Sequence, residues 1–210
     1  MKRGYQLIII AVTLIALILG SLVTFRYFQV KNFTKDLNIS LNDKQYQNDT
    51  VSNRWQNIVK AKAQAIEMGI PKNAYGYLKI PSVNLKLPIF RGTNDYTLSI
   101  GVATYYYDDA EAGKANFVLA GHTTPYEGVL LTNLSSVSEN DKIEIETVDK
   151  SFHYTVDTIQ VVDDEIEIIE SQLPTFLALP KTTEKAKITL FTCVDWQNNS
   201  QRLVVSGHLN

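Results

Sequence analysis

The chain has 210 residues, of which 45% are hydrophobic, and its formal net charge at pH 7 is −2. This length and composition suit one ordinary globular domain with accessory segments. No basic stripe interrupts the near-neutral charge, so a nucleic-acid-binding surface is excluded and no nucleic acid partner is expected. One cysteine and three histidines cannot supply the cluster of thiolates and imidazoles that structural zinc needs.

The N-terminal region contains a long apolar run. Leu7 to Val23 carries no charge, and an uncharged stretch extends from Tyr5 to Phe25. As a helix this stretch would span roughly 31 Å, close to the ~30 Å hydrocarbon core of a bilayer. We predict a transmembrane signal anchor over residues 7–25 after a short cytoplasmic tail, residues 1–6. The alternative is a cleaved signal peptide, whose apolar region is usually only ~7–15 residues. Basic residues flank both ends, which leaves the orientation open.

Residues 26–70 are predicted to form a polar stalk. Much of this segment is rich in Asn, Asp, Lys, Gln and Ser, a composition that is typical of loosely structured chain. A helix is predicted over residues 54–68, where good helix formers carry apolar residues at helical spacing. Gly69 followed by Pro71 ends this helix.

From residue 71 onward the sequence predicts a β domain. Short runs of alternating or β-branched residues are separated by Gly, Asn, Asp and Pro, a pattern that indicates a mostly β sandwich or closed barrel. The predicted strands are 75–80, 83–90, 100–107, 116–120, 142–147, 151–162, 187–192 and 202–209.

Cys193 ends the predicted strand 187–192 and precedes a polar, turn-like segment. Strand ends are common positions for reactive side chains, because the sheet holds them rigidly. A thiol needs a nearby base or cation to become an effective nucleophile. The candidate bases are His122, His153 and His208. His122 shares the strand-end placement of Cys193, whereas His153 lies inside an alternating strand and His208 near the C-terminus.

Arg202 opens the final predicted strand, a short loop after Cys193. If the two strands are adjacent and antiparallel, its guanidinium lies near the thiol and can stabilise a developing oxyanion. The alternative is an exposed arginine at a strand end.

Three motifs together resemble the sortases, specifically class A. They are Thr-Leu-Phe-Thr-Cys at 189–193, Ala-Gly-His-Thr at 120–123, and the arginine at 202. The resemblance covers roughly residues 74–209, and the predicted anchor fits it. It implies a closed eight-stranded sortase β-barrel with short helices as the catalytic domain, residues 71–210.

The resemblance also implies a membrane-anchored cysteine transpeptidase on the outer surface of a Gram-positive bacterium. Cys193 would attack the Thr–Gly carbonyl of a Leu-Pro-x-Thr-Gly sorting signal, and an amine of a peptidoglycan precursor of the lipid II type would resolve the thioacyl enzyme. His122 would be the general acid and base, and Arg202 would stabilise substrate and oxyanion. The expected partners are secreted proteins bearing C-terminal sorting signals, the precursor amine and the membrane.

Seven further positions match the substrate groove of the family. Ala120, Thr189 and Phe191 match positions that line the groove, and Thr192 precedes the proposed nucleophile. Ile166, Ile168 and Leu173 belong to an apolar loop before the strand of Cys193. An apolar pocket for the Leu-Pro end of the signal would suit this loop. The alternative is that its apolar residues only pack the loop down.

No cofactor is expected, and no dependence on calcium is expected. Some class A members bind calcium through acidic residues. Here only Asp109 falls near such a position, in a stretch with one residue more than the calcium-binding pattern, and Glu165 in the later loop could offer a further oxygen. The short spacing from Cys193 to Arg202 is more similar to streptococcal-type enzymes that work without calcium.

The sequence leaves two alternative functions open. A pilin-polymerising sortase typically adds a hydrophobic segment after the barrel and a lid motif before it; neither pattern is found in the sequence, so we expect the attachment role. From a different class, the protein would be a membrane-tethered β binding module whose buried cysteine is inert, which requires the three motifs to coincide by chance.

Overall fold

The computed structural model describes residues 11–25, 53–105, 110–163, 186–196 and 200–210. By its contacts the chain divides into two compact units, Met1–Asp49 and Thr50–Asn210. Residues 11–25 are helical with exposed side chains, whereas residues 7–10 of the predicted anchor and 26–52 of the predicted stalk lie outside the described ranges. Within the described part, no helix combines the length and apolar character needed to cross a membrane.

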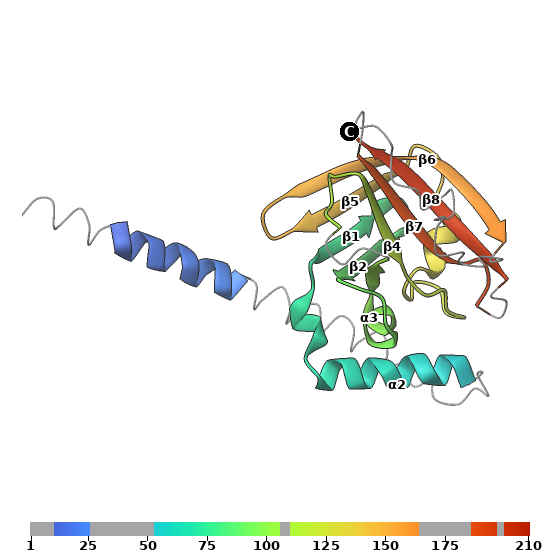
Figure 1. Ribbon diagram of the computed structural model, residues 1–210, viewed down its shortest axis with the longest axis horizontal. Helices are drawn as coiled ribbons and strands as arrows, with labels where there is room; N and C mark the ends of the chain where they lie inside the picture. Colours follow the sequence, from blue (N-terminus) through green and yellow to red (C-terminus); the bar gives the residue numbers. More distant parts are fainter. Residues whose placement is uncertain (1–10, 26–52, 106–109, 164–185, 197–199) are drawn as a thin grey trace, which may run out of the picture. The chain divides into compact units, whose positions relative to one another are not determined.

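Eight strands close into a barrel within the described part of the second unit (Figure 1). Around the barrel the order is β1-β2-β3-β4-β7-β8-β6-β5. The strands are β1 (Gly76–Ile80), β2 (Leu85–Phe90), β3 (Val102–Thr104), β4 (Asn116–Ala120), β5 (Lys142–Thr147), β6 (Ser151–Asp163), β7 (Lys187–Cys193) and β8 (Gln201–Leu209). The predicted mostly β, closed eight-stranded barrel is therefore confirmed.

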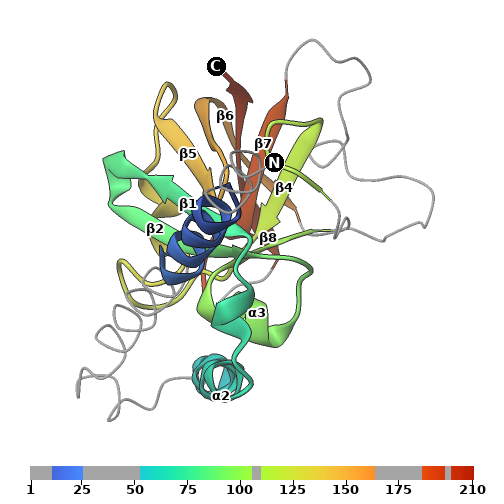
Figure 2. The ribbon, with the colours of Figure 1, turned by 90° about the vertical axis from the view of Figure 1, so that its left-hand side faces the viewer.

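Strand β7 is hydrogen-bonded to β4 on one side and to β8 on the other; Figure 2 shows the three together. The β4–β7 pair is parallel, with Ala120 opposite Phe191. The β7–β8 pair is antiparallel, with Cys193 opposite Arg202. This arrangement gathers the C-terminal ends of β4 and β7 and the start of β8 at one end of the barrel.

The barrel interior is filled by one face of each strand. Alternate residues of a strand point to opposite sides, so Phe117 and Leu119 of β4 share a face, as do Ile188 and Leu190 of β7. All four are fully buried in one large apolar cluster. Each buried side chain of this size contributes ~1.5–3 kcal/mol. The packed interior gives the strand ends a rigid support.

A smaller apolar cluster, here called the outer cluster, lies on the other face of the same strands. It consists of Val118, Ala120, Phe191 and Val204, with the partly buried Leu98, Tyr105 and Val162 packed against it. Because Phe191 and Cys193 are two residues apart on β7, their side chains point to the same face. The outer cluster therefore lies beside the thiol.

Helix α2 (Asn53–Glu67) belongs to the same compact unit as the barrel, which differs from its predicted place in a stalk. Its buried residues, Trp55, Ala61, Lys62 and Ala65, lie on one helical face, since they recur at spacings of three, four and six to seven positions. Gly69, with φ of 72°, follows the helix in the left-handed conformation that glycine favours. Trp55 is only 4% exposed, so the start of α2 is packed into the fold.

Two strands begin two residues later than the sequence predicted. The predicted strand 100–107 starts inside helix α3 (Asp95–Ile100), and β3 follows at Val102. The predicted strand 83–90 begins at Leu85, after the short 3-10 helix η3 (Pro81–Val83). Two further 3-10 helices are η2 (Ile70–Asn73) and η4 (Thr132–Ser136).

A capping box explains the unpredicted helix α3. The Oδ1 atom of Asn94 accepts hydrogen bonds from the backbone N–H groups of Tyr96 and Thr97, each at 3.0 Å. The Thr97 hydroxyl in turn accepts from the backbone N–H of Asn94 at 3.1 Å. Such reciprocal bonds satisfy N–H groups that the first turn of a helix leaves without partners.

Replacing Asn94 by alanine should lower the free energy of unfolding by about 1 kcal/mol, because the first turn of α3 loses its cap. Urea denaturation followed by circular dichroism measures this change. Thr93→Ala, at the exposed residue just before the cap, is the matched control and should leave the midpoint unchanged. Equal midpoints for Asn94→Ala and wild type would contradict the capping role.

Candidate active site

Cys193 is the last residue of β7, and its side chain is 9% exposed. The β-branched and aromatic residues before it favour the extended conformation. Pairing with β4 fixes the backbone of β7 up to Phe191, and pairing with β8 fixes it up to Cys193. The predicted junction of a rigid strand and a loop is therefore found at the thiol.

Arg202 lies directly across from Cys193 in the β7–β8 pair. Its Nη1 atom donates a hydrogen bond to Cys193 Sγ over 3.4 Å. This is the proximity that the short loop between the two strands predicted. A guanidinium stays charged at any physiological pH and holds its N–H donors in a fixed plane. The arrangement favours negative charge on the sulfur or on an oxygen close to it.

His122 follows β4 at the same end of the barrel. The backbone N–H of Gly121 donates to the carbonyl of Phe191 at 3.2 Å, so the contact between β4 and β7 continues one residue past Ala120. The next residue, His122, is therefore carried alongside the end of β7, and its side chain is partly buried. Between the described residues, no hydrogen bond joins its ring to Cys193, a common situation in sites without bound substrate.

Thr123 holds the segment of His122 against the segment of Cys193. Its hydroxyl donates to the backbone carbonyl of Cys193 at 2.7 Å, and 2.8 Å separates its Oγ1 from that of Thr192. A hydroxyl has a single hydrogen, so Thr192 is the donor in the second bond. Both threonine side chains are buried. These bonds fix the distance between the backbones that carry the imidazole and the thiol.

The other two histidines lie at the opposite end of the barrel. His208 pairs with Lys187 at the other end of β7, about 20 Å from Cys193 at a rise of ~3.3 Å per residue. Its Nδ1 lies 3.0 Å from Asp157 Oδ2. The backbone carbonyl of His153 accepts from the N–H of Asn210, beyond the end of β8. His122 alone among the three lies at the thiol.

Burial lowers the pKa of His122 below the ordinary value of an imidazole, and the positive charge of Arg54 lowers it further. The carboxylate of Asp95, on α3, acts in the opposite direction. A lowered pKa favours the neutral imidazole, the form that accepts a proton from an incoming group.

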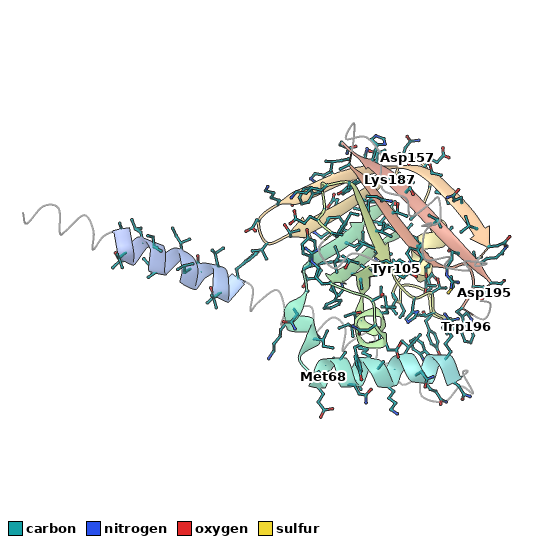
Figure 3. All side chains as sticks on the ribbon, viewed as in Figure 1. Met68, Tyr105, Asp157, Lys187, Asp195 and Trp196 are labelled. Carbon is teal, nitrogen blue, oxygen red and sulfur yellow. The ribbon has the colours of Figure 1, made fainter. Side chains whose placement is uncertain are left out.

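Arg54 reaches the thiol from the first turn of α2. Its Nη2 atom donates to Cys193 Sγ at 3.4 Å, and its Nη1 atom donates to the backbone carbonyl of Trp196 at 2.7 Å. In Figure 3, Trp196 lies above one end of α2, whereas Met68 marks the other end and Lys187 the far end of β7. The sulfur therefore has two guanidinium neighbours, of which the sequence analysis found only Arg202.

The predicted groove residues of the strands fall on two faces. Ala120 and Phe191 belong to the outer cluster on the face of Cys193, where the Phe191 ring packs edge-on against Tyr105 with centroids 4.8 Å apart. Thr189 lies on that face too, with its buried hydroxyl donating to Asn116 Oδ1 at 2.9 Å. Thr192 points to the opposite face, toward Thr123.

The remaining predicted site residues lie outside the described residues. These are Ile166, Ile168 and Leu173 of the apolar loop, and Asp109 and Glu165 as the calcium candidates. Among the residues that are described, no three His, Cys, Asp or Glu side chains are grouped so that they could hold a metal ion.

The arrangement suits nucleophilic acyl transfer. A single thiol stands at a rigid strand end, the segment that carries the partly buried His122 is bonded to the same strand end, and two guanidinium groups contact the sulfur. Such a set can form a thioester, move a proton and balance negative charge. Thr123 and Arg54 are the members that the sequence analysis did not assign. Thr123 was within the quoted motif, but Arg54 is 139 positions from Cys193, and only the tertiary structure places it there.

Comparisons with known proteins point to one family. Residues 78–210 match the model of the Sortase family, described as a sortase domain. Sortase A of Bacillus anthracis is 34% identical over 139 residues, which cover 66% of this chain and 60% of that protein. Sortase A of Listeria monocytogenes is 33% identical over 135 residues, covering 64% of this chain and 55% of that protein. The matched segment thus spans less than two thirds of each relative.

Solved structures share the barrel. Sortase A of Listeria monocytogenes superposes with a TM-score of 0.57 at 32% identity, covering 66% of this chain and 88% of that one. Sortase C-1 of Actinomyces oris superposes with a TM-score of 0.56 at 28% identity, covering 72% and 79%. Helix α2 precedes the segment that the family model matches.

The titration of His122 tests the electrostatics of the site. By nuclear magnetic resonance, its ring should titrate below the ordinary imidazole value of about 6.5. Asp95→Asn removes the carboxylate that favours the protonated ring, so this variant should lower the pKa of His122 further. Glu127→Gln, at an exposed residue of the loop after His122, is the control for loss of a carboxylate. A rise in the pKa with Asp95→Asn would refute the assignment.

Proposed function

The chain belongs to the sortase family, and we propose that it is a cysteine transpeptidase with Cys193 as its nucleophile. The observation that carries the proposal is the hydrogen bond from Arg202 Nη1 to Cys193 Sγ, at the strand end that also carries His122. A structural cysteine in a packed core needs no such charged donor. An inert binding module is therefore the weaker interpretation.

In the first half-reaction, the sulfur of Cys193 attacks the carbonyl carbon between Thr and Gly of a Leu-Pro-x-Thr-Gly sorting signal. The C–N bond breaks as protonated His122 gives its proton to the leaving glycine amine, and a thioester remains on the enzyme. In the second, an amine of a peptidoglycan precursor attacks the thioester while neutral His122 takes its proton. The C–S bond breaks, and the sulfur leaves as a thiolate that is ready for another cycle.

Arg202 is proposed to stabilise the negative charge that moves between sulfur and carbonyl oxygen. Its donors already lie at the sulfur, so little reorganisation is needed when charge develops on the adjacent tetrahedral centre. Thr123 is proposed as a positioning residue, because it touches the backbone of Cys193 and the side chain of Thr192.

The outer cluster is proposed to bind the sorting signal. Ala120 and Phe191 are apolar and lie on the same face as the thiol, and the same strands carry the buried hydroxyl of Thr189. Ile166, Ile168 and Leu173 are proposed to complete an apolar pocket for the Leu-Pro end. The position of Thr192, on the other face of β7, supports a role in holding the His122 segment more than one in substrate contact.

The uncharged run Leu7–Val23 is proposed to anchor the protein in the cell membrane, with the N-terminus in the cytoplasm and the barrel outside. This placement would bring the enzyme to secreted proteins with C-terminal sorting signals and to membrane-bound cell-wall precursors of a Gram-positive bacterium. Exposed apolar side chains along the described helix 11–25, such as Leu14 and Leu17, support it.

Pilin polymerisation remains the second candidate, because a sortase C structure superposes nearly as well as a sortase A structure. The two functions differ in the acceptor. A lysine side chain on a pilin would resolve the thioester in one case, and an amine of the cell-wall precursor in the other.

The purified full-length chain should cleave a fluorogenic Leu-Pro-x-Thr-Gly peptide, faster when a glycine-based amine is added. Cys193→Ala should abolish cleavage, since no thioester can form. His122→Ala should lower kcat/KM by about 10²–10⁴-fold and Arg202→Ala by about 10²–10³-fold.

His153→Ala is the matched control for these variants, because this exposed histidine lies at the other end of the barrel, and its kcat/KM should equal that of wild type. Cleavage by Cys193→Ala, or a wild type that leaves the peptide intact, would overturn the proposal. Exclusive use of lysine-bearing acceptors would favour the pilin alternative.

Expressed in a Gram-positive host, the protein should sediment with membranes and resist extraction by alkaline carbonate. Arginine at both Leu14 and Leu17 should release it, since each charge near the centre of a spanning helix costs about 2.5–3.5 kcal/mol. Val161→Arg, at an exposed apolar residue of β6, is the control and should stay membrane-bound. Intact mass identifies the alternative, because a chain that lacks the apolar run would mean a cleaved signal peptide.

A further inference from the structure

Helix α2 supplies a charged contact to the reacting atom of the site. Arg54 Nη2 lies as close to Cys193 Sγ, at 3.4 Å, as Arg202 Nη1 does. It comes from outside the segment, 78–210, that matches the family model. The contact therefore does not follow from the barrel that this chain shares with its relatives.

The guanidinium of Arg54 is held from both of its terminal nitrogens. While Nη2 reaches the sulfur, Nη1 donates to the carbonyl of Trp196 at 2.7 Å. Trp196 lies in the segment that follows β7, so Arg54 joins the helix, this segment and the thiol. Because the planar guanidinium is already bonded to two separate acceptors, it loses little further conformational freedom when negative charge develops on one of them.

Packing of the next residue fixes where Arg54 can point. The Trp55 indole is 4% exposed, and its ring meets that of Tyr126 edge-on with centroids 4.9 Å apart. Tyr126 lies in the segment after His122. The first turn of α2 is thereby packed against the segment that carries the imidazole, and Arg54 is presented to the thiol by a buried neighbour.

Two charged donors on one sulfur distinguish between the neutral thiol and the negatively charged thiolate as the form that the site stabilises. A neutral thiol is a weak hydrogen-bond acceptor, whereas hydrogen bonds between ionised groups are the strong ones. Cations beside a cysteine favour its thiolate. We propose that Arg54 is a catalytic residue that stabilises the negatively charged sulfur of Cys193 together with Arg202. This inference rests on the proposed transpeptidase function for its part in the reaction, during attack and again when the sulfur leaves the thioester.

The opposite effect of the same contact would be shielding, in which Arg54 only blocks access to the thiol. The two effects change the reactivity of the sulfur in opposite directions, so they can be separated. The charged groups in contact with the sulfur are Arg54 on α2 and Arg202 on β8. His122 follows β4 at the same end of the barrel, Asp195 lies two residues after Cys193 in the chain, and Asp95 on α3 acts on His122.

Alkylation of Cys193 by iodoacetamide measures the reactivity of the sulfur directly in the full-length chain. The sulfur displaces iodide and the thiol proton passes to the buffer, so the rate follows the thiolate character of the sulfur and needs no peptide substrate. Arg54→Gln keeps much of the side-chain length but removes the charge, and it should slow alkylation at pH 7 about tenfold. The difference should shrink at alkaline pH, where thiols ionise without help.

Lys60→Gln is the matched control, because it removes one positive charge from an exposed position of the same helix, and its alkylation rate should equal that of wild type. Arg54→Lys keeps the charge without the fork and should give an intermediate rate. Trp55→Ala keeps Arg54 but removes the packing that presents it, and should also slow alkylation. Thermal unfolding followed by circular dichroism confirms that each variant is folded.

Faster alkylation of Arg54→Gln would establish shielding and overturn the proposal, and so would a rate equal to that of wild type. In peptide cleavage, Arg54→Gln should lower kcat/KM about tenfold or more, with the loss mainly in kcat. If alkylation slows but the wild type cleaves no sorting-signal peptide, the proposed function fails while the role of Arg54 at the sulfur stands. If the wild type cleaves peptide and Arg54→Gln cleaves it equally well, only the role of Arg54 fails.

Discussion

The position of β7 between β4 and β8 is the constraint on which the candidate site depends. Its parallel ladder to β4 sets the level at which His122 leaves the sheet, and its antiparallel ladder to β8 sets Arg202 opposite Cys193. A slip of one residue in either ladder would turn the side chains of that strand to the other face. The buried hydrogen bonds of Thr123 add a side-chain lock at the point where the parallel ladder ends.

The site concentrates positive charge in a chain whose net charge is −2. Two guanidinium groups contact the sulfur, and Arg54 also opposes protonation of His122. A cationic surrounding favours a neutral imidazole, the form that accepts a proton from an incoming amine. Asp95 works against this trend, because its carboxylate favours the protonated ring that a leaving amine needs. The balance between these charges therefore bears on both half-reactions of the proposed chemistry.

Much of the barrel could be predicted from the sequence, because most strands carry a local signal in their alternating or β-branched residues. The proximity of Cys193 and Arg202 was predictable for a related reason, since strands joined by a short loop tend to pair. Helix α3 was missed although Asn94 and Thr97 carry a capping signal. Arg54 could not be found in this way, because no local pattern tells which distant strand end a helix will cover. The same limit applies to α2, whose sequence predicts a helix but not the contacts of Arg54 and Trp55 with the segments after β7 and β4.

The attachment of Arg54 to a helix ahead of the segment that matches the family bears on how such a protein can be recombined. A module cut at the boundary of the family match, residue 78, would carry the nucleophile, the imidazole and Arg202 but would leave one cation behind. Grafting the barrel onto another leader would then yield a chimera with a less polarised sulfur. The unit to transfer is accordingly the barrel together with helix α2, residues 53–67. The boundary for such a graft lies before α2.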